Sequence, residues 1–472
     1  MSRKKGKELP VIEDIEITGI AAEGNSITRH NDKVVFIPYG APGDIVDVKI
    51  DRRRSSYSEG HIVNIKKPSP LRVTPFCVHF GTCGGCKWQH LPYSYQLEFK
   101  RQQVVDALTR IAKIPFPEVN PCLPSENQIR YRNKLEYTFS NKKWLTFEQL
   151  GSGLEFPDRD GAGFHIPGCF DKVLDIEECH LQEEFGNRLR LFIKDYAKRN
   201  GWSFYDLKGQ SGFMRTLMIR TLDSGQKMAV MVFGENDKAK IDELMDAVSK
   251  EFPEITSLSY VVNLKVNDTI TDQDVIPWNG SSPYIEEIMG ELKFRIGPKS
   301  FYQTNSRQAH RLYATAERMA NLKGDELVYD LYTGTGTIAN FVANKCKRVI
   351  GIEYVPEAIE DARINSSINK IDNTEFFAGD MKDVLTDEFI ARHGRPDVMI
   401  VDPPRAGMHA DVVKVIKNTK PKRIVYVSCN PATQARDLAD LYELYDIVEV
   451  QPVDMFPHTH HVENVVALTL RG

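Results

Sequence analysis

A cysteine stands at the end of an apolar run close to the C-terminus. Residues 424–427 are β-branched or aromatic and predict a buried strand, and Ser428, Cys429, Asn430 and Pro431 follow it. Proline ends such a strand because it lacks a backbone N–H and restricts the residue before it. Cys429 is therefore expected at a strand tip, just before a helix. A thiol there can pack, ligate a metal or act as a nucleophile, and a helix N-terminus could help to form the thiolate.

A glycine-containing turn precedes this cysteine in the chain. In residues 328–339 (VYDLYTGTGTIA) a strand leads to a turn at Gly334 and Gly336, and a helix begins near Thr337. Glycine lets the backbone approach a ligand at the carboxyl end of a strand. Taken alone the signal is weak, because the full G-x-G-x-x-G pattern is absent.

Acidic residues end the strands that follow. Glu353 ends RVIGIE and could accept two ribose hydroxyls, and Asp380 ends TEFFAGD and could accept from an adenine amino group. Asp402 opens a D-P-P turn, for which a proline-stiffened loop is the purely structural alternative. Dinucleotide oxidoreductases and S-adenosylmethionine methyltransferases share this pattern. The missing glycine and the lack of a phosphate grip favour S-adenosylmethionine.

The last chemical segment is FPHTHHVE. Glu463 stands between this turn and a closing strand, so it can turn back toward the carboxyl edge of the sheet. The spacing of His458, His460 and His461 matches no common zinc site, and we expect no metal there.

Three cysteines cluster early in the chain. Cys77, Cys83 and Cys86 form a soft thiolate site, and a Gly-Gly pair separates the last two. Three thiolates need a fourth ligand, and the candidates are Cys122, Cys169 and Cys179.

Three regions must position these residues, so we expect a multi-domain chain. Residues 1–70 hold short alternating stretches separated by turn residues and predict a small OB-like β-barrel. Residues 71–285 predict a central α+β domain that carries the cysteine cluster, including a helix at about 94–113 that can pack on the catalytic domain. Residues 286–472 alternate apolar strands with helices, which is typical of a Rossmann-like α/β domain with a parallel sheet.

Charge and hydropathy restrict the partners. Basic residues outnumber acidic ones in the first 115 residues although the formal net charge is −4, which suits RNA but also fits a solvated face. No stretch approaches the roughly 18–20 apolar residues of a membrane helix. The polar N-terminus has no signal-peptide core. We expect a cytoplasmic protein without membrane contact, and nothing in the sequence indicates more than a monomer.

Five segments, in this order, resemble the RNA 5-methyluridine (uracil-5) methyltransferases: FYQTNSRQA, DLYTGTG, VDPPRAG, VYVSCNPATQARD and FPHTHHVE. The N-terminal barrel resembles the TRAM RNA-binding domain. Cys77, Cys83 and Cys86 resemble the iron–sulfur motif of the branch that acts on 23S rRNA. By the same resemblance Cys179 is the fourth ligand of a [4Fe–4S] cluster, with a structural zinc ion as the alternative. The resemblance is weakest over residues 140–280.

The resemblance implies methyl transfer from S-adenosylmethionine to C5 of a uridine in 23S rRNA. Cys429 would be the nucleophile that adds to C6, Glu463 the general base, and Asp402 the contact to the uracil edge. The implied cofactor-binding residues are Gln303, Tyr332, Gly334, Gly336, Thr337, Glu353, Asp380 and Asp402.

Three alternatives stay open. The same chemistry could act on the T-loop uridine of tRNA. An amino-group methyltransferase would also use a D-P-P turn, but it has no need of Cys429 or Glu463. A protein of another class, an inactive RNA-binding assembly factor, would retain the fold without turnover.

Overall fold

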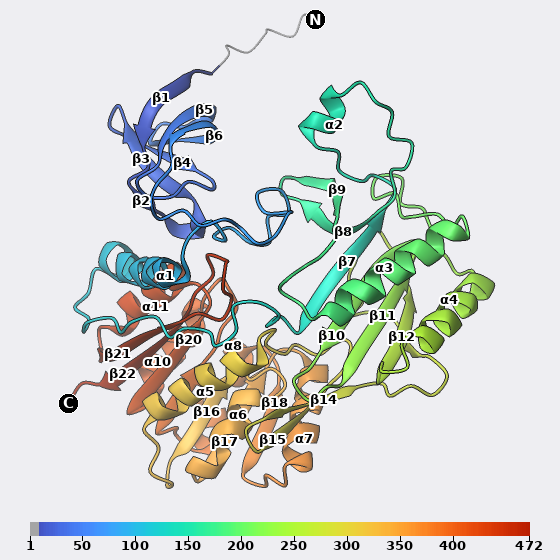
Figure 1. Cartoon of the computed structure of the whole chain (residues 1–472). Helices are drawn as coiled ribbons and strands as arrows, with labels where there is room; N and C mark the ends of the chain where they lie inside the picture. The colour runs from blue at the N-terminus through green and yellow to red at the C-terminus, as the bar shows by residue number, and fades with distance from the viewer. Residues whose placement is uncertain (1–8) are drawn as a thin grey trace, which may run out of the picture.

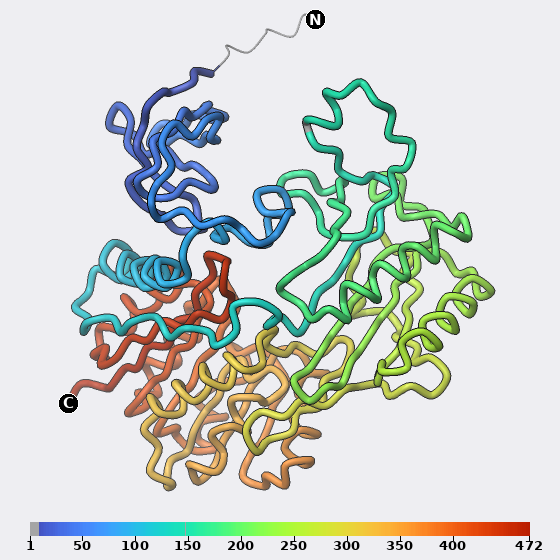
Figure 2. Tube along the Cα trace, in the orientation of Figure 1, coloured from blue at the N-terminus to red at the C-terminus, as the bar shows by residue number. Residues whose placement is uncertain are grey.

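Along the described part of the chain, four β-sheets follow one another, and one of them is a two-stranded hairpin (Figure 1). The computed structural model describes residues 9–472. In the orientation shared by Figure 1 and Figure 2, the N-terminal sheet lies above the C-terminal seven-stranded sheet, and the central sheet lies beside both. No helix within the described residues is both long and apolar enough to cross a membrane.

The N-terminal unit is a six-stranded sheet in the order β1-β5-β6-β4-β3-β2. Alternating apolar residues on these strands enclose a small core that includes Val35, Val46 and Val48. The elements are β1 (Val11–Glu16), β2 (Gly19–Ile20), η1 (Ala22–Gly24), β3 (Ser26–His30), β4 (Lys33–Ile37), β5 (Ile45–Arg53) and β6 (Tyr57–Lys67).

A cysteine-bearing loop and one long helix connect this unit to the rest. Helix α1 (Tyr93–Ala107) runs into the π-turn η2 (Leu108–Ala112). Val104 and Leu108 on this segment share a core with Leu438 and Leu441 of the C-terminal region. The N-terminal helix thus covers part of the catalytic sheet.

The central unit is a mixed seven-stranded sheet in the order β13-β12-β11-β10-β7-β8-β9, with helices packed on it. Only β11 and β12 run parallel; the other pairs are antiparallel. The elements are β7 (Lys134–Ser140), α2 (Phe147–Gly151), β8 (Gly161–Ile166), β9 (Cys169–Asp175), α3 (Glu184–Arg199), β10 (Met214–Thr221), β11 (Lys227–Phe233), α4 (Lys238–Glu251), β12 (Ser257–Val262) and β13 (Ile276–Pro277).

The hairpin of β14 (Ile285–Met289) and β15 (Leu292–Ile296) leads into the catalytic unit, a seven-stranded sheet in the order β18-β17-β16-β19-β20-β22-β21. The first five strands are parallel, and β22 and β21 are antiparallel additions at one edge. Its helices are α5 (Ser306–Ala320), α6 (Thr337–Val342), η3 (Ala343–Lys345), α7 (Pro356–Ile368), α8 (Met381–Val384), α9 (Asp387–His393), α10 (Ala410–Thr419) and α11 (Pro431–Leu441). Its strands are β16 (Leu327–Leu331), β17 (Arg348–Glu353), β18 (Thr374–Ala378), β19 (Val398–Val401), β20 (Arg423–Ser428), β21 (Tyr445–Val453) and β22 (Glu463–Leu470).

Two apolar cores lie on opposite faces of this sheet. Helices α5, α6 and α7 contribute to one, and α10, α11 and α1 contribute to the other. The strands are buried on both faces, which explains their nearly continuous apolar runs. The strand order reverses between β16 and β19, and ligands bind at the carboxyl ends beside such a reversal.

Candidate active site

An open cleft of about 1390 Å³ lies at the carboxyl ends of these strands. It brings together residues that are more than 150 positions apart in the sequence. The predicted residues on its lining are Gln303, Tyr332, Gly334, Glu353, Asp380, Asp402, Cys429 and Glu463. Of the predicted catalytic and cofactor-binding residues, all of which lie in the described part of the chain, Gly336 and Thr337 are outside this lining.

The turn after β16 uses its two glycines differently. Both have positive φ, +55° at Gly334 and +74° at Gly336, which favours glycine. A Cβ on Gly336 would lie 2.9 Å from the Cβ of Ala362, so this glycine allows α6 to pack closely on α7. A Cβ on Gly334 would meet nothing within 4 Å. Gly334 therefore leaves room in the cleft, whereas Gly336 serves packing.

Two carboxylates lie beside this turn. The Glu353 carboxylate accepts from the backbone N–H of Gly334 at 3.2 Å and of Val355 at 3.0 Å, which fixes it at the end of β17. Asp380 caps α8 and accepts from the N–H of Lys382 at 3.2 Å. Each carboxylate is held by backbone donors and is available to a polar ligand in the cleft.

Cys429 lies between the end of β20 and the start of α11. Asn430 caps the helix, and its side-chain oxygen accepts from the N–H of Ala432 at 3.1 Å. Burial raises the pKa of Cys429 to about 11, with further increases from Glu463 and Asp402. Any help that the helix N-terminus gives to the thiolate is therefore outweighed by burial and by the adjacent carboxyl groups.

Two carboxyl groups face this thiol. Burial raises the pKa of Asp402 to about 7. Burial and the charge of Asp402 raise the pKa of Glu463 to about 8, whereas Arg405 and Lys100 oppose that shift. Both carboxyl groups therefore exchange protons close to neutral pH, as acid–base groups require.

Arg405 and Tyr313 are residues of the site that were not predicted from the sequence. Arg405 lines the cleft and opposes the rise in the pKa of Cys429. Tyr313 is buried on α5, and its hydroxyl is hydrogen-bonded to the side chain of Gln303. Arg405 follows the D-P-P turn, so its place in the motif was a signal. Tyr313 lies on an ordinary amphipathic helix and gave none.

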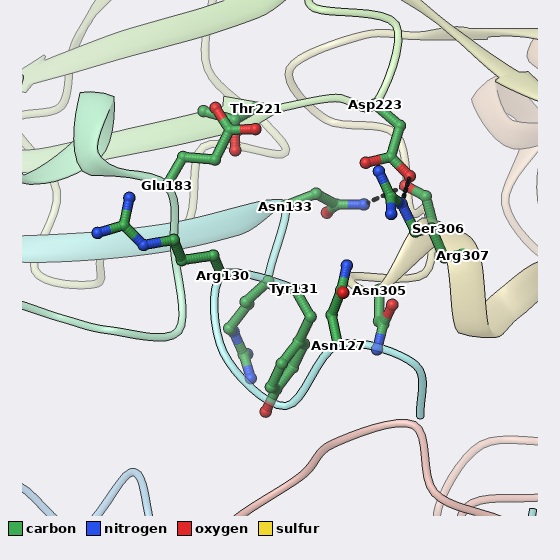
Figure 3. A pocket seen from close by; sticks show the side chains of 11 residues that line it. Asn127, Arg130, Tyr131, Asn133, Glu183, Thr221, Asp223, Asn305, Ser306 and Arg307 are labelled. Carbon is green, nitrogen blue, oxygen red and sulfur yellow. Dashed lines mark hydrogen bonds and ion pairs between the residues drawn. The ribbon is translucent and has the colours of Figure 1, made fainter. Parts of the chain in front are cut away.

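A small polar pocket lies at the junction with the central unit, next to the loop that carries Gln303 (Figure 3). A side chain of its lining bonds to that loop. The Asn133 side chain donates to the Gln303 carbonyl at 2.9 Å and to the Ser306 hydroxyl at 2.8 Å. Figure 3 shows Asn133 pointing toward Ser306, with the ion pair of Arg307 and Asp223 beside it. The central sheet thus fixes one wall of the cleft.

The early cysteines line a second cavity, of about 260 Å³. Cys77, Cys83 and Cys86 come from the loop before α1, and Cys179 comes from the segment between β9 and α3. Burial raises the pKa of Cys83 to about 11 and that of Cys86 to about 12. Within residues 9–472, no group of three or more His, Cys, Asp or Glu side chains is arranged to hold a metal ion.

Among the described residues, the remaining three cysteines line neither cavity. Cys122 and Cys346 are buried, and Cys169 begins β9. All eight cysteines are free thiols.

Comparison with known proteins matches both ends of the chain to families. Residues 285–471 match the model described as tRNA (Uracil-5-)-methyltransferase, and residues 3–63 match the TRAM domain. An uncharacterized RNA methyltransferase of Porphyromonas gingivalis is 59% identical over 96% of this chain and 99% of its own. The chain belongs to the RNA (uracil-5-)-methyltransferase family. The predicted TRAM domain and methyltransferase fold are confirmed.

Two more members of the RNA (uracil-5-)-methyltransferase family show how far the similarity extends. An uncharacterized RNA methyltransferase of Bacteroides thetaiotaomicron is 56% identical over 96% of this chain and 100% of its own. The structure of the tRNA (uracil-54, C5)-methyltransferase of Pyrococcus abyssi with S-adenosyl-L-homocysteine is 30% identical, with a TM-score of 0.75. That match covers 97% of this chain and all of the other.

Proposed function

We propose that this enzyme transfers a methyl group from S-adenosylmethionine to C5 of a uridine in 23S rRNA through a covalent bond between Cys429 and C6. One observation carries the proposal: Cys429, Asp402 and Glu463 line the same cleft as Gly334 and Glu353. A nucleophile, an acid–base pair and a cofactor cradle thus share one cavity.

The cleft suits the cofactor. The open space before Gly334 admits a ligand against the backbone, and Glu353 offers a carboxylate fixed for ribose hydroxyls. Asp380 stands where an adenine amino group can donate to it. S-adenosylmethionine, when bound, supplies an electrophilic methyl group.

The residues of the chain perform the remaining steps. C5 of uracil is a poor nucleophile, so the thiolate of Cys429 first adds to C6 and pushes electron density onto C5. The thiol has to lose its proton, and the carboxylates beside it can accept one. After C5 has gained the methyl group, Glu463 removes the C5 proton, and the bond from C6 to Cys429 breaks to restore the thiolate. Asp402 hydrogen-bonds the uracil edge.

The rate of methylation is expected to rise with pH from about 7 to 9. Cys429 and Glu463 act as deprotonated groups, and both have pKa values above neutral, about 11 and about 8. Raising the pH therefore increases the active form of each. Single-turnover rates across this range, with cofactor binding checked at each pH, test the expectation. A rate that falls as pH rises would contradict it.

Replacing Glu353 tests the cofactor site. Glu353→Ala is expected to weaken S-adenosylmethionine binding about 10- to 100-fold, because a hydrogen bond to a charged group contributes about 1.5–3 kcal/mol. Titration calorimetry measures the loss. Glu360→Ala, in the exposed Glu360–Arg363 pair on α7, is the matched control and should bind normally. If both variants bind S-adenosylmethionine with equal affinity, Glu353 is not part of the cofactor site.

The choice of 23S rRNA depends on the TRAM domain and the cysteine set. The Pyrococcus abyssi enzyme acts on tRNA, so tRNA is the competing substrate. The target base must leave its stack to expose C6, so a loop or a flipped uridine is required in either RNA.

RNA that contains 5-fluorouridine separates these substrates. Fluorine cannot leave as a proton, so the reaction stalls as a covalent adduct that survives a denaturing gel. An adduct with a 23S rRNA fragment alone supports the proposal. An adduct with tRNA alone would mean that the same reaction acts on tRNA instead. A chain that forms no adduct and fails to bind S-adenosylmethionine would be an inactive assembly factor.

We also propose that Cys77, Cys83, Cys86 and Cys179 bind a [4Fe–4S] cluster. Four thiols line one cavity of about 260 Å³, and four thiolates are the number of ligands that such a cluster takes, although the side chains are not arranged around a metal position in this structure. Gly84 shapes the loop between two of them, because a Cβ there would lie 2.3 Å from Pro167. The cluster would stabilise the loop and the attachment of the central unit. A zinc ion is the alternative occupant.

Cys179→Ser is expected to remove the cluster. Protein purified without oxygen should contain four irons per chain and show thiolate-to-iron absorption, and the variant should lose both, since one ligand is missing. Cys122→Ser, a buried cysteine outside the cavity lining, is the control and should retain iron. Zinc in the wild type instead of iron would favour the alternative.

A further inference from the structure

The turn that leads to Glu463 is held largely from outside the catalytic sheet. This catalytic turn, residues 454–462, joins β21 to β22. Three successive carbonyl groups in it, those of Phe456, Pro457 and His458, accept hydrogen bonds from distant segments. The donors are Lys100 Nζ at 3.0 Å, the Tyr131 hydroxyl at 3.0 Å, and the N–H groups of Lys87 at 2.9 Å and Trp88 at 3.0 Å.

Lys100 also pairs with a buried carboxylate at the start of the turn. Lys100 and Asp454 are both 0% exposed, and Lys100 Nζ lies 2.5 Å from Asp454 Oδ1. The other oxygen of Asp454 accepts from the Tyr93 hydroxyl at 2.7 Å. Burying two charges is costly and does not by itself stabilise a fold. The buried pair of Lys100 and Asp454 therefore points to a role other than packing.

The buried stripe of α1 supports this view. Gln96, Lys100, Val104 and Leu108 follow one another at a spacing of four residues, and all four are buried. The apolar half contacts the core shared with α11, whereas the polar half faces the catalytic turn. Gln96 accepts from the N–H of His458 at 2.9 Å, and its amide lies 3.2 Å from His458 Nδ1. The helix thus packs with one half and holds the turn with the other.

The ammonium group of Lys100 also acts on Glu463 electrostatically. Its positive charge opposes the burial that raises the pKa of Glu463. The other groups that face Glu463 are Asp402, Arg405, Cys429 and Tyr313. Lys100 and Arg405 both lower this pKa and both contact the catalytic turn, Arg405 through an exposed contact of 3.4 Å to His461 Nδ1. Lys100 differs in that it pairs with Asp454 of the turn in a site where both side chains are fully buried.

We propose that Lys100 is a positioning residue for the general base, acting through the catalytic turn. This proposal rests on the proposed function, in which Glu463 removes the C5 proton after methyl transfer. Loss of the ammonium group should slow the breakdown of the methylated Cys429 adduct and leave its formation nearly unchanged. A residue that only stabilised the fold would affect both steps equally.

The test follows radiolabelled methyl from S-adenosylmethionine into wild type, Lys100→Met, Lys100→Arg and the control Gln102→Met, an exposed position on the same helix. The RNAs are ordinary uridine transcripts of a 23S rRNA fragment and a tRNA. In Lys100→Met, labelled adduct should accumulate, and its breakdown should slow about tenfold for each unit by which the pKa of Glu463 rises. The pH profile of breakdown should move to higher pH. Lys100→Arg should restore it in part, and Gln102→Met should match wild type.

A second variant separates the proposed role of Lys100 from an effect of misfolding. Lys100→Met with Asp454→Asn leaves no unpaired buried charge and should show the same accumulation of adduct. Unchanged breakdown in Lys100→Met, or an equal loss of both steps in the single and the double variant, would overturn the proposal. If wild type forms no adduct with either 5-fluorouridine RNA, the proposed function fails as well. The two failures are therefore distinguishable.

Discussion

Cys429→Ala is expected to abolish methylation, with a loss of roughly 10⁴-fold or more, as is typical when a covalent nucleophile is removed. The thiol lies at the tip of β20 in the same cleft as both carboxyl groups, and no other cysteine lines that cleft among the described residues. The 5-fluorouridine adduct should disappear together with turnover. A denaturing gel and a methyl-transfer assay measure the two losses.

The matched control is Cys346→Ala, a buried cysteine beside η3 and outside the cleft lining. It should keep both the adduct and the activity, although it can lower thermal stability by leaving a small cavity. Full methylation by Cys429→Ala would reject covalent catalysis and favour transfer to an amino group, for which no such nucleophile is needed.

Glu463→Gln is expected to separate the two halves of the reaction. The amide keeps the size of the side chain but cannot accept a proton, so the methylated adduct should form and then persist on ordinary uridine. We expect overall turnover to fall about 10²- to 10⁴-fold, the usual contribution of a general base. The neutral amide also removes a negative charge that raises the pKa of Cys429, so adduct formation should not slow.

Glu443→Gln is the control, because Glu443 pairs with Lys417 at the surface. It should behave as wild type. If Glu463→Gln lowers adduct formation and breakdown together, Glu463 acts before methyl transfer, and another group must take the C5 proton. Asp402 would then be the first candidate, because it faces the same thiol.

The positions of the cleft residues could be predicted from the sequence, whereas their pKa values could not. Strand tips in a parallel sheet share one edge, so Glu353, Asp380, Asp402 and Cys429 could be expected together from local pattern alone. Their pKa values depend on burial and on neighbours from distant segments. The raised pKa of Cys429 therefore could not be inferred from the helix that follows it.

The role of α1 shows a second limit. Helical spacing of apolar residues is the signal for the face that packs, yet Ile111, an apolar residue at the end of this segment, is 46% exposed. The buried face instead includes Gln96 and Lys100, whose partners lie more than 350 residues away. A buried polar residue gives no periodic signal, because its partner belongs to another part of the chain.

The position of α1 has a consequence for biosynthesis. Its apolar side is completed by Leu438 and Leu441, which emerge from the ribosome more than 300 residues later. At roughly 5–20 residues per second, that delay is on the order of 15–60 s, during which the side of the helix that packs on α11 lacks its native partners. The catalytic unit is therefore discontinuous in sequence. Its folding must end with the last strands closing over a helix made near the beginning, and a fragment that starts at residue 285 would expose the surface on which α1 normally packs.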